Sequence, residues 1–191
     1  MYRQIPNYLT IMRLVAAPLV AMILLLSTSP FWALVALIIY ALASATDWLD
    51  GYLARRWQSV SSFGRMLDPI ADKLMVVIML TTLMGTNLAS LWLAIPSLII
   101  VTREIMVSGL REFMAKQDFI VHVTLSAKLK TTVQLIAIGF LIGQFLFAEG
   151  SLYHQLVSWI GMGGLWLAAY LTAQTGIAYF SAAIAHIKSQ S

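Results

Sequence analysis

Four aspartates stand close together in a chain that is otherwise strongly apolar. Asp47 and Asp50 are three residues apart, and Asp68 and Asp72 are four residues apart. Those spacings place each pair on one face of an α-helix. Carboxylates without His or Cys suit hard divalent cations such as Mg²⁺ or Mn²⁺. Four carboxylates are enough for two ions, and a pair of ions stabilises both the attacking and the leaving oxygen in a displacement at phosphorus.

The surroundings of these acids favour the metal interpretation. A charged side chain at the centre of a bilayer costs about 2.5 to 3.5 kcal/mol, so four uncompensated aspartates would cost roughly 10 kcal/mol. Gly51 and Ala54 lie between the two pairs, and such small residues let a phosphate or nucleotide approach the backbone. The alternative is simple pairing of the acids at a membrane surface with basic residues nearby, namely Arg55, Arg56, Arg65 and Lys73. That alternative does not explain four acids on shared helix faces.

The composition identifies the class of protein that must position these residues. The chain has 191 residues, of which 60% are hydrophobic and 10% charged, whereas soluble domains carry about 25% charged residues. Its mean hydropathy is +0.85. Six apolar stretches of about 20 residues nearly fill the length, which predicts an all-α, polytopic membrane protein with six transmembrane helices in a single domain, residues 1–191. Because there is no cysteine, disulfides and thiolate chemistry are excluded.

The six expected spans follow from the apolar runs and the polar turns between them. The first run is interpreted as a retained span rather than a signal peptide. The spans are expected at residues 6–26, 31–56, 65–84, 91–114, 127–147 and 156–187.

Charge asymmetry predicts how the helices are oriented. All twelve Lys and Arg residues fall toward the termini and the connections on one side of the membrane, and the opposite turns hold only Glu149. By the positive-inside rule, both termini and the aspartates are expected on the cytoplasmic side of a bacterial inner membrane.

The acidic stretch also matches a known pattern. From Asp47 to Asp72 it reads D-x2-D-G-x2-A-R-x8-G-x3-D-x3-D, and it resembles the signature of the CDP-alcohol phosphotransferases at all eight fixed positions. The resemblance implies a homodimer of six-helix protomers and a pair of divalent metal ions. It implies that Asp47, Asp50 and Asp68 are metal ligands. Asp72, also near a metal, is the implied general base toward the acceptor hydroxyl.

The resemblance implies further contacts with the substrates. The implied neighbours of the cytidine nucleotide are Gly51, Ala54 and Arg55, with Thr10 and Asn7 as additional candidates. Three other segments are similar to family members that use CDP-diacylglycerol as donor and glycerol 3-phosphate as acceptor. They are Asn7-x-Leu9-Thr10-x2-Arg13, Thr102–Ile105 with Leu110–Glu112, and Ala127-Lys128-x-Lys130-Thr131-x2-Gln134.

Four basic residues fit an acceptor that carries phosphate. Arg103 and Arg111 are eight positions apart, roughly two helical turns, and Lys128 and Lys130 lie at the start of the next span. A basic group facing a metal site suits glycerol 3-phosphate. The alternative for these residues is snorkelling toward lipid headgroups, above all for Lys130.

The implied reaction is phosphatidyl transfer from CDP-diacylglycerol to glycerol 3-phosphate, with release of CMP. Two alternatives stay open. One is another acceptor within the family, such as inositol phosphate or phosphatidylglycerol. The other is a divalent-cation transporter, although its acids should be spread across the membrane depth, and here the outer halves of the spans hold none. Membrane lipids are expected partners, and no nucleic acid is.

Overall fold

The computed structural model describes residues 5–57, 62–86, 90–115 and 125–190. Within those ranges it does not describe the side chains of 5–7, 47–57, 62–65, 68, 115, 125–128 and 189–190. The described residues form six α-helices and one 3₁₀ turn. They are α1 (Ile5–Leu26), α2 (Pro30–Trp57), α3 (Ser62–Gly85), α4 (Leu91–Ala115), α5 (Leu125–Gly143), η2 (Gln144–Leu146) and α6 (Leu152–Gln190). The predicted all-α architecture of six helices is therefore confirmed.

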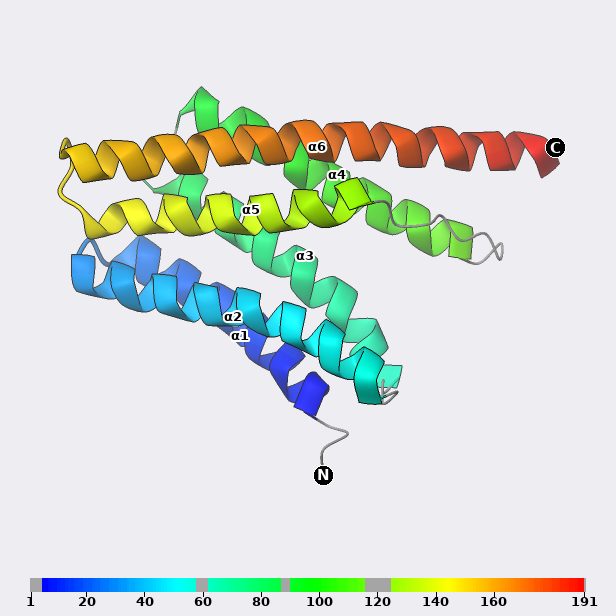
Figure 1. Cartoon of the computed structure of the whole chain (residues 1–191), viewed down its shortest axis with the longest axis horizontal. Coiled ribbons are helices and arrows are strands. Elements are labelled where there is room, and N and C mark those ends of the chain that lie inside the picture. The colour runs from blue at the N-terminus through cyan, green and yellow to red at the C-terminus, as the bar shows by residue number, and fades with distance from the viewer. Residues whose placement is uncertain (1–4, 58–61, 87–89, 116–124, 191) are drawn as a thin grey trace.

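The helices alternate in direction along the chain. In Figure 1, α1 begins and α6 ends at the same end of the molecule, together with the end of α2 and the start of α3. Helix α1 packs against both α2 and α3, α5 packs against α6, and α4 packs against α6. This arrangement brings the polar ends of all six helices to one end of the bundle.

Most of the helices have the length and apolarity that a bilayer requires. Four stretches of the described chain satisfy both conditions, and α2 contributes a shorter apolar segment, Pro30–Thr46. The four are Tyr8–Leu26, Leu91–Met114, Leu129–Leu146 and Leu152–Lys188. Together they identify a membrane protein.

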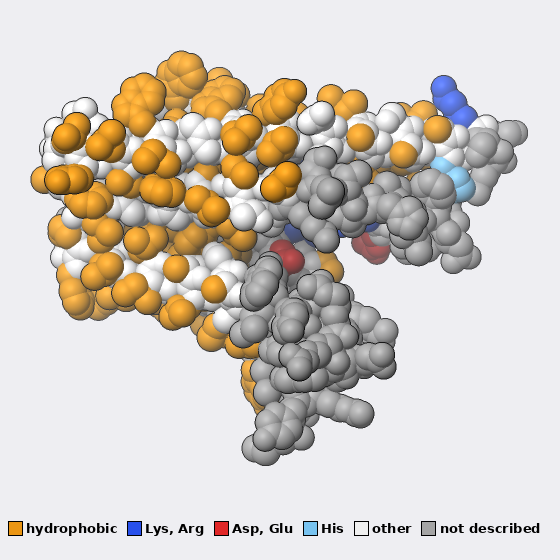
Figure 2. All heavy atoms as spheres, viewed as in Figure 1, with side chains coloured by type: hydrophobic (Ala, Val, Ile, Leu, Met, Phe, Trp, Pro, Cys, Tyr) orange, Lys and Arg blue, Asp and Glu red, His pale blue; other side chains and the backbone are white. Residues whose placement is uncertain are grey.

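Apolar side chains occupy both the interior and the outside of the bundle. Met79, Leu93 and Leu165 are fully buried between helices. Large apolar residues such as Trp92 and Tyr170 are exposed, and hydrophobic atoms cover most of the described surface in Figure 2 away from the polar end. A surface of this kind suits lipid rather than water as its surroundings.

Two glycines allow α5 and α6 to approach closely. A Cβ atom on Gly161 would lie 2.9 Å from Cγ of Leu141, and one on Gly164 would lie 3.0 Å from Cβ of Ala137. Small residues at a helix contact are a common means of packing in membranes.

The turn between α5 and α6 differs from expectation by a few residues. Helix α5 was expected to reach residue 147 but ends at Gly143, and the chain continues as a 3₁₀ turn. The side chain of Gln144 donates to the carbonyl of Leu141 at 2.7 Å, which satisfies one of the terminal carbonyls. Helix α6 begins at Leu152 rather than 156, because Ser151 caps it by accepting from the backbone N–H of His154 at 3.2 Å.

Candidate active site

The acidic residues lie on two helices that both contact α1. Asp47 and Asp50 are on α2, and Asp68 and Asp72 are on α3. The side chains of Asp47, Asp50 and Asp68 are outside the described part of the chain. Their predicted convergence therefore stays a prediction, and the described geometry of this region begins with Asp72.

Asp72 forms an ion pair with Arg13 of α1. The Arg13 guanidinium donates from Nη1 to Oδ1 of Asp72. The arginine side chain is 2% exposed, whereas that of Asp72 is 48% exposed. Removing the carboxylate partner of a buried cation is strongly destabilising, so Asp72 contributes to keeping Arg13 within the helix bundle. The exposed part of the same carboxylate faces outward, where a substrate or ion can reach it.

Arg13 was not predicted as a site residue, although its position carried a signal. An arginine inside an apolar span costs about 2.5 to 3.5 kcal/mol at the bilayer centre, which predicts a specific partner. Thr10 lies three residues earlier and is fully buried, so both residues lie on the same side of α1. The other predicted nucleotide neighbours, Asn7, Gly51, Ala54 and Arg55, have side chains outside the described part.

The donor chemistry of the acidic region fits a divalent cation. All four predicted ligands offer carboxylate oxygens, which hard ions such as Mg²⁺ and Mn²⁺ prefer. Among the described side chains, no three His, Asp or Glu residues gather as a metal site, but that set includes just Asp72 of the four aspartates.

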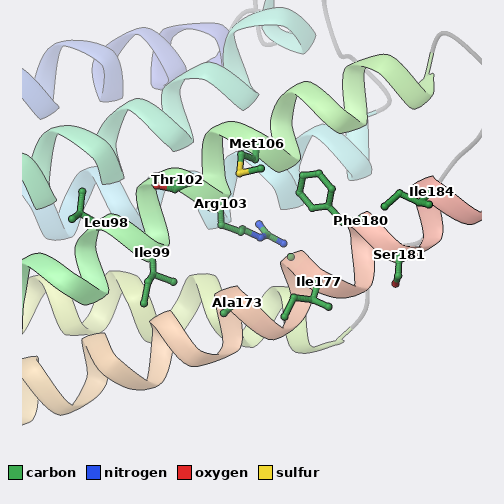
Figure 3. A pocket seen from close by; sticks show the side chains of 11 residues that line it. Leu98, Ile99, Thr102, Arg103, Met106, Ala173, Ile177, Phe180, Ser181 and Ile184 are labelled. Carbon is green, nitrogen blue, oxygen red and sulfur yellow. The ribbon is translucent and has the colours of Figure 1, made fainter.

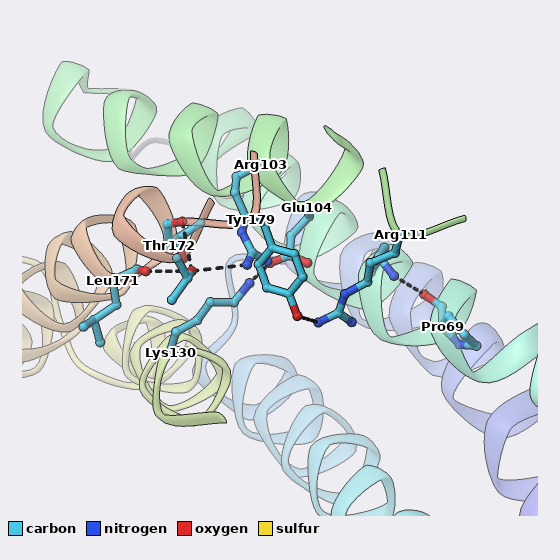
Figure 4. Close-up of polar contacts among 10 residues, drawn as sticks. Pro69, Arg103, Glu104, Arg111, Lys130, Leu171, Thr172 and Tyr179 are labelled. Carbon is cyan, nitrogen blue, oxygen red and sulfur yellow. Dashed lines mark hydrogen bonds and ion pairs between the residues drawn. The ribbon is translucent and has the colours of Figure 1, made fainter. Parts of the chain in front are cut away.

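A second polar group joins α4, α5 and α6, and we call Arg103, Arg111 and Lys130 the basic cluster. Glu104 lies among its members (Figure 4). The Lys130 ammonium donates to Oε1 of Glu104, and Nη1 of Arg103 lies 3.5 Å from the same oxygen. Lys130 is 4% exposed, which rules out snorkelling to the membrane surface for this residue. Lys128 belongs to the same predicted set, but its side chain is outside the described part.

Helix α6 supplies further contacts to the basic cluster. Arg111 donates from Nη2 to the hydroxyl of Tyr179 at 2.6 Å, and its Cζ lies 5.0 Å from the centre of the tyrosine ring. Arg103 donates from Nη2 to Oγ1 of Thr175 at 3.2 Å. Sequence reasoning found the two arginines but missed Glu104, Thr175 and Tyr179.

A sequence profile of the CDP-alcohol phosphatidyltransferase family matches residues 3–174. This chain belongs to the CDP-alcohol phosphatidyltransferase family. The aspartates, Arg13 and the basic cluster all lie within the matched segment.

Several bacterial members of the family resemble the chain over nearly its whole length. A protein of Cereibacter sphaeroides is 39% identical over 97% of this chain and 98% of its own length. One from Rickettsia bellii is 43% identical over 93% of this chain and 94% of its own length, and one from Haemophilus influenzae is 38% identical over 94% and 92%. Each of these relatives is named CDP-diacylglycerol–glycerol-3-phosphate 3-phosphatidyltransferase.

This CDP-alcohol phosphatidyltransferase also has an apolar groove of about 700 Å³ between α4 and α6. Its walls include Leu98, Met106, Ile177 and Phe180, and the Arg103 side chain projects between the two helices (Figure 3). A charged group of the basic cluster therefore also borders a surface that suits lipid.

Proposed function

We propose that this protein transfers the phosphatidyl group of CDP-diacylglycerol to glycerol 3-phosphate, giving phosphatidylglycerol phosphate and CMP. Membership of the family and the names of the full-length relatives support the reaction class. The single observation that carries the choice of acceptor is the basic cluster. Arg103 and Lys130 share the Glu104 carboxylate, and Arg111 lies against Tyr179, so the cluster has more positive than negative charge, which suits an alcohol that itself carries a phosphate.

In the proposed reaction, Asp72 accepts the proton of the primary hydroxyl of glycerol 3-phosphate. The resulting oxygen attacks the lipid-side phosphorus of the donor. The bond between that phosphorus and the bridging oxygen breaks, and CMP leaves with the electron pair. The acceptor phosphate is bound by Arg103, Arg111, Lys128 and Lys130 of α4 and α5. Holding the two reactants in this orientation lowers the entropic part of the barrier.

We propose that Asp47, Asp50, Asp68 and Asp72 hold two divalent cations, Mg²⁺ or Mn²⁺. When bound, the ions neutralise the pyrophosphate of the donor and stabilise charge that develops during transfer. The all-oxygen donor set supports this choice of metal. Arg13 restrains Asp72 from the α1 side, so the carboxylate keeps one orientation while its exposed part faces the reactants.

The donor nucleotide is proposed to lie near the start of the signature, beside Gly51, Ala54 and Arg55. Thr10 and Asn7 of α1 are further proposed contacts. The buried position of Thr10, one turn from Arg13, supports a site between α1 and the acidic helices. The acyl chains of the donor stay in the bilayer.

We further propose that the protein is a homodimer in the bacterial inner membrane, with both termini and the active site on the cytoplasmic side. All Lys and Arg residues of the sequence fall toward the termini and the connections on the same side, which supports this orientation. Cysteine substitutions at Ser27 and Ser189 of this cysteine-free chain offer a direct test by labelling from either side of sealed vesicles. Labelling of the Ser189 variant from the outside would overturn the orientation.

An acceptor screen tests the reaction itself. Purified protein is incubated with CDP-diacylglycerol, Mg²⁺ and one alcohol at a time, and CMP release is measured. We expect release with glycerol 3-phosphate, and loss of release after chelation that Mg²⁺ or Mn²⁺ reverses. Release with inositol phosphate or phosphatidylglycerol, but not with glycerol 3-phosphate, would contradict the proposed acceptor.

A further inference from the structure

Helix α6 contributes a face to the basic cluster that lies beyond the segment matched by the family profile. The profile ends at residue 174, and the face consists of Thr175, Gly176 and Tyr179. We infer that this face positions the acceptor-binding arginines, and that Tyr179 is the residue that fixes their separation and direction. The inference rests on the proposed function, because it concerns the site for the acceptor phosphate.

The contacts of Tyr179 join the two arginines. Arg103 and Arg111 are eight residues apart on α4, which separates their Cα atoms by about 12 Å along the helix axis. Both guanidiniums nevertheless lie against one aromatic ring, with Cζ of Arg103 5.8 Å and Cζ of Arg111 5.0 Å from its centre. The tyrosine is 4% exposed, so packing holds the ring in place. The fixed ring of Tyr179 therefore restrains the positions of two long and flexible arginine side chains.

The tyrosine hydroxyl orients Arg111 in particular. Its oxygen accepts from Nη2 of Arg111 at 2.6 Å, a short bond typical of a charged donor. A guanidinium has five N–H donors in a planar fork, and this bond uses one of them. With one edge held by the hydroxyl and one face against the ring, the remaining edge has a defined direction toward a phosphate.

The residues beside Tyr179 position Arg103 in a similar way. Thr175 accepts from Nη2 of Arg103, and its own hydroxyl donates to the carbonyl of Leu171 at 2.8 Å. Gly176 leaves room for the arginine stem, because a Cβ atom there would lie 3.0 Å from Cγ of Arg103. This face of α6 thus makes three different contacts with the arginine pair. Thr175 accepts a hydrogen bond from Arg103, Gly176 leaves room for its stem, and the ring of Tyr179 contacts both guanidiniums.

The consequence is specific to binding of the acceptor. Tyr179 touches neither the acidic helices nor the proposed donor site among the described contacts, so its hydroxyl should affect the KM for glycerol 3-phosphate rather than kcat. A tyrosine that served packing alone would affect thermal stability and both substrates together. Tyr179→Phe keeps the ring and removes the hydroxyl, which separates the two roles.

The test measures initial rates of CMP release with each substrate varied in turn. For Tyr179→Phe we expect the KM for glycerol 3-phosphate to rise about three- to tenfold, with kcat and the KM for CDP-diacylglycerol within about twofold of wild type. The matched control is Tyr170→Phe, on the same helix but exposed on the lipid-facing surface, which should match wild type in all three. An unchanged KM for glycerol 3-phosphate in Tyr179→Phe, or an equal change for both substrates, would overturn the inference.

A second pair of variants tests the space for Arg103. Gly176→Ala places a methyl group against the arginine stem and should raise the same KM by about threefold or more, while Gly163→Ala, on the same helix with nothing within 4 Å of the new atom, should not. Ala is favoured over Gly in a helix, so neither change should lower the unfolding temperature for reasons of backbone preference. A Gly176→Ala enzyme with the wild-type KM would contradict the assigned role of this face.

If wild type itself releases no CMP with glycerol 3-phosphate, the proposed function fails instead, and the two failures are distinguishable.

Discussion

The two polar regions of this molecule are opposite in charge but similar in construction. The acidic region comprises the four aspartates of α2 and α3, whose convergence is predicted, and the basic cluster gathers cations of α4 and α5. Each contains an ion of the opposite sign: Arg13, which is buried, pairs with Asp72, and Glu104, which is 14% exposed, pairs with Lys130 and Arg103. An unpaired charge in an apolar bundle is costly, so each of these oppositely charged residues stabilises the charged groups that it contacts. Ion pairs that stabilise the fold therefore lie within both polar regions.

The largest expected effect comes from the acidic region. Asp72→Asn should lower kcat about 10²- to 10⁴-fold, the range typical for loss of a general base, while weakening metal binding less. Asp68→Ala and Asp50→Ala should abolish both turnover and metal binding. The measurements are CMP release and Mn²⁺ titration followed by electron paramagnetic resonance. Full Mn²⁺ binding by Asp68→Ala would remove that residue from the proposed ligands.

The next largest effect is a loss of stability, and it comes from Glu104, the acidic residue within the basic cluster. Glu104→Gln leaves Lys130 and Arg103 without their described carboxylate, and we expect a loss of about 3 to 5 kcal/mol in stability. Thermal unfolding in detergent checks this, with Glu149→Gln as an exposed control at the opposite end of the bundle. Adding Lys130→Met to Glu104→Gln should restore part of the loss, because the two residues interact directly. An unfolding temperature unchanged in Glu104→Gln would mean that the pair contributes nothing to stability.

A smaller effect on affinity is expected from a member of the basic cluster near its exposed edge. Arg111→Ala should raise the KM for glycerol 3-phosphate about 10- to 100-fold with little change in kcat, because it removes charge-assisted binding of the ground state. Steady-state kinetics with each substrate varied separately measure the effect. If the affinity for CDP-diacylglycerol falls alone, Arg111 belongs to the donor site.

The smallest effect on stability and turnover should come from Lys73, a cation assigned to neither polar region. Lys73 follows Asp72 in the chain, yet its ammonium donates to the carbonyl of Pro69 in its own helix, at 3.1 Å. Lys73→Met is therefore expected to change stability by less than about 0.5 kcal/mol and turnover by less than about twofold. Thermal unfolding and CMP release are measured for Lys73→Met and for Arg13→Met, and we expect much larger losses in the second variant because Arg13 is buried. A loss from Lys73→Met as large as that from Arg13→Met would show that burial does not distinguish the two cations.

Local patterns made the helices and the acidic faces predictable. Long apolar runs separated by polar turns define helix positions in a membrane chain, and the bounds agreed to within a few residues. The spacing of Asp47 with Asp50, and of Asp68 with Asp72, is a property of single helices and needs no knowledge of packing. The shift at α5 and α6 arose where Gln144 and Ser151 satisfy terminal backbone groups, a detail that apolarity does not encode.

Contacts between distant helices were less accessible to sequence reasoning. Arg13 meets Asp72 across 59 positions, Lys130 meets Glu104 across 26, and Arg111 meets Tyr179 across 68. A charged residue within an apolar span indicates that it has a partner but does not identify which residue that partner is. Tyr179 had no such signal, because a tyrosine in an apolar helix is equally typical of the core and of the membrane interface.

The length of α6 has a consequence for how water-soluble and lipid reactants meet. Its 39 residues extend about 58 Å, roughly twice the thickness of the hydrocarbon layer. With Leu152 at the outer edge of one headgroup layer, Tyr179 lies about 40 Å along the axis, within the opposite headgroup layer of a bilayer that is about 40 to 45 Å thick in total. A small polar alcohol can then bind from the aqueous phase at the depth of the diphosphate of a lipid that stays in the bilayer. The alcohol does not have to enter the hydrocarbon layer, and the lipid does not have to enter water.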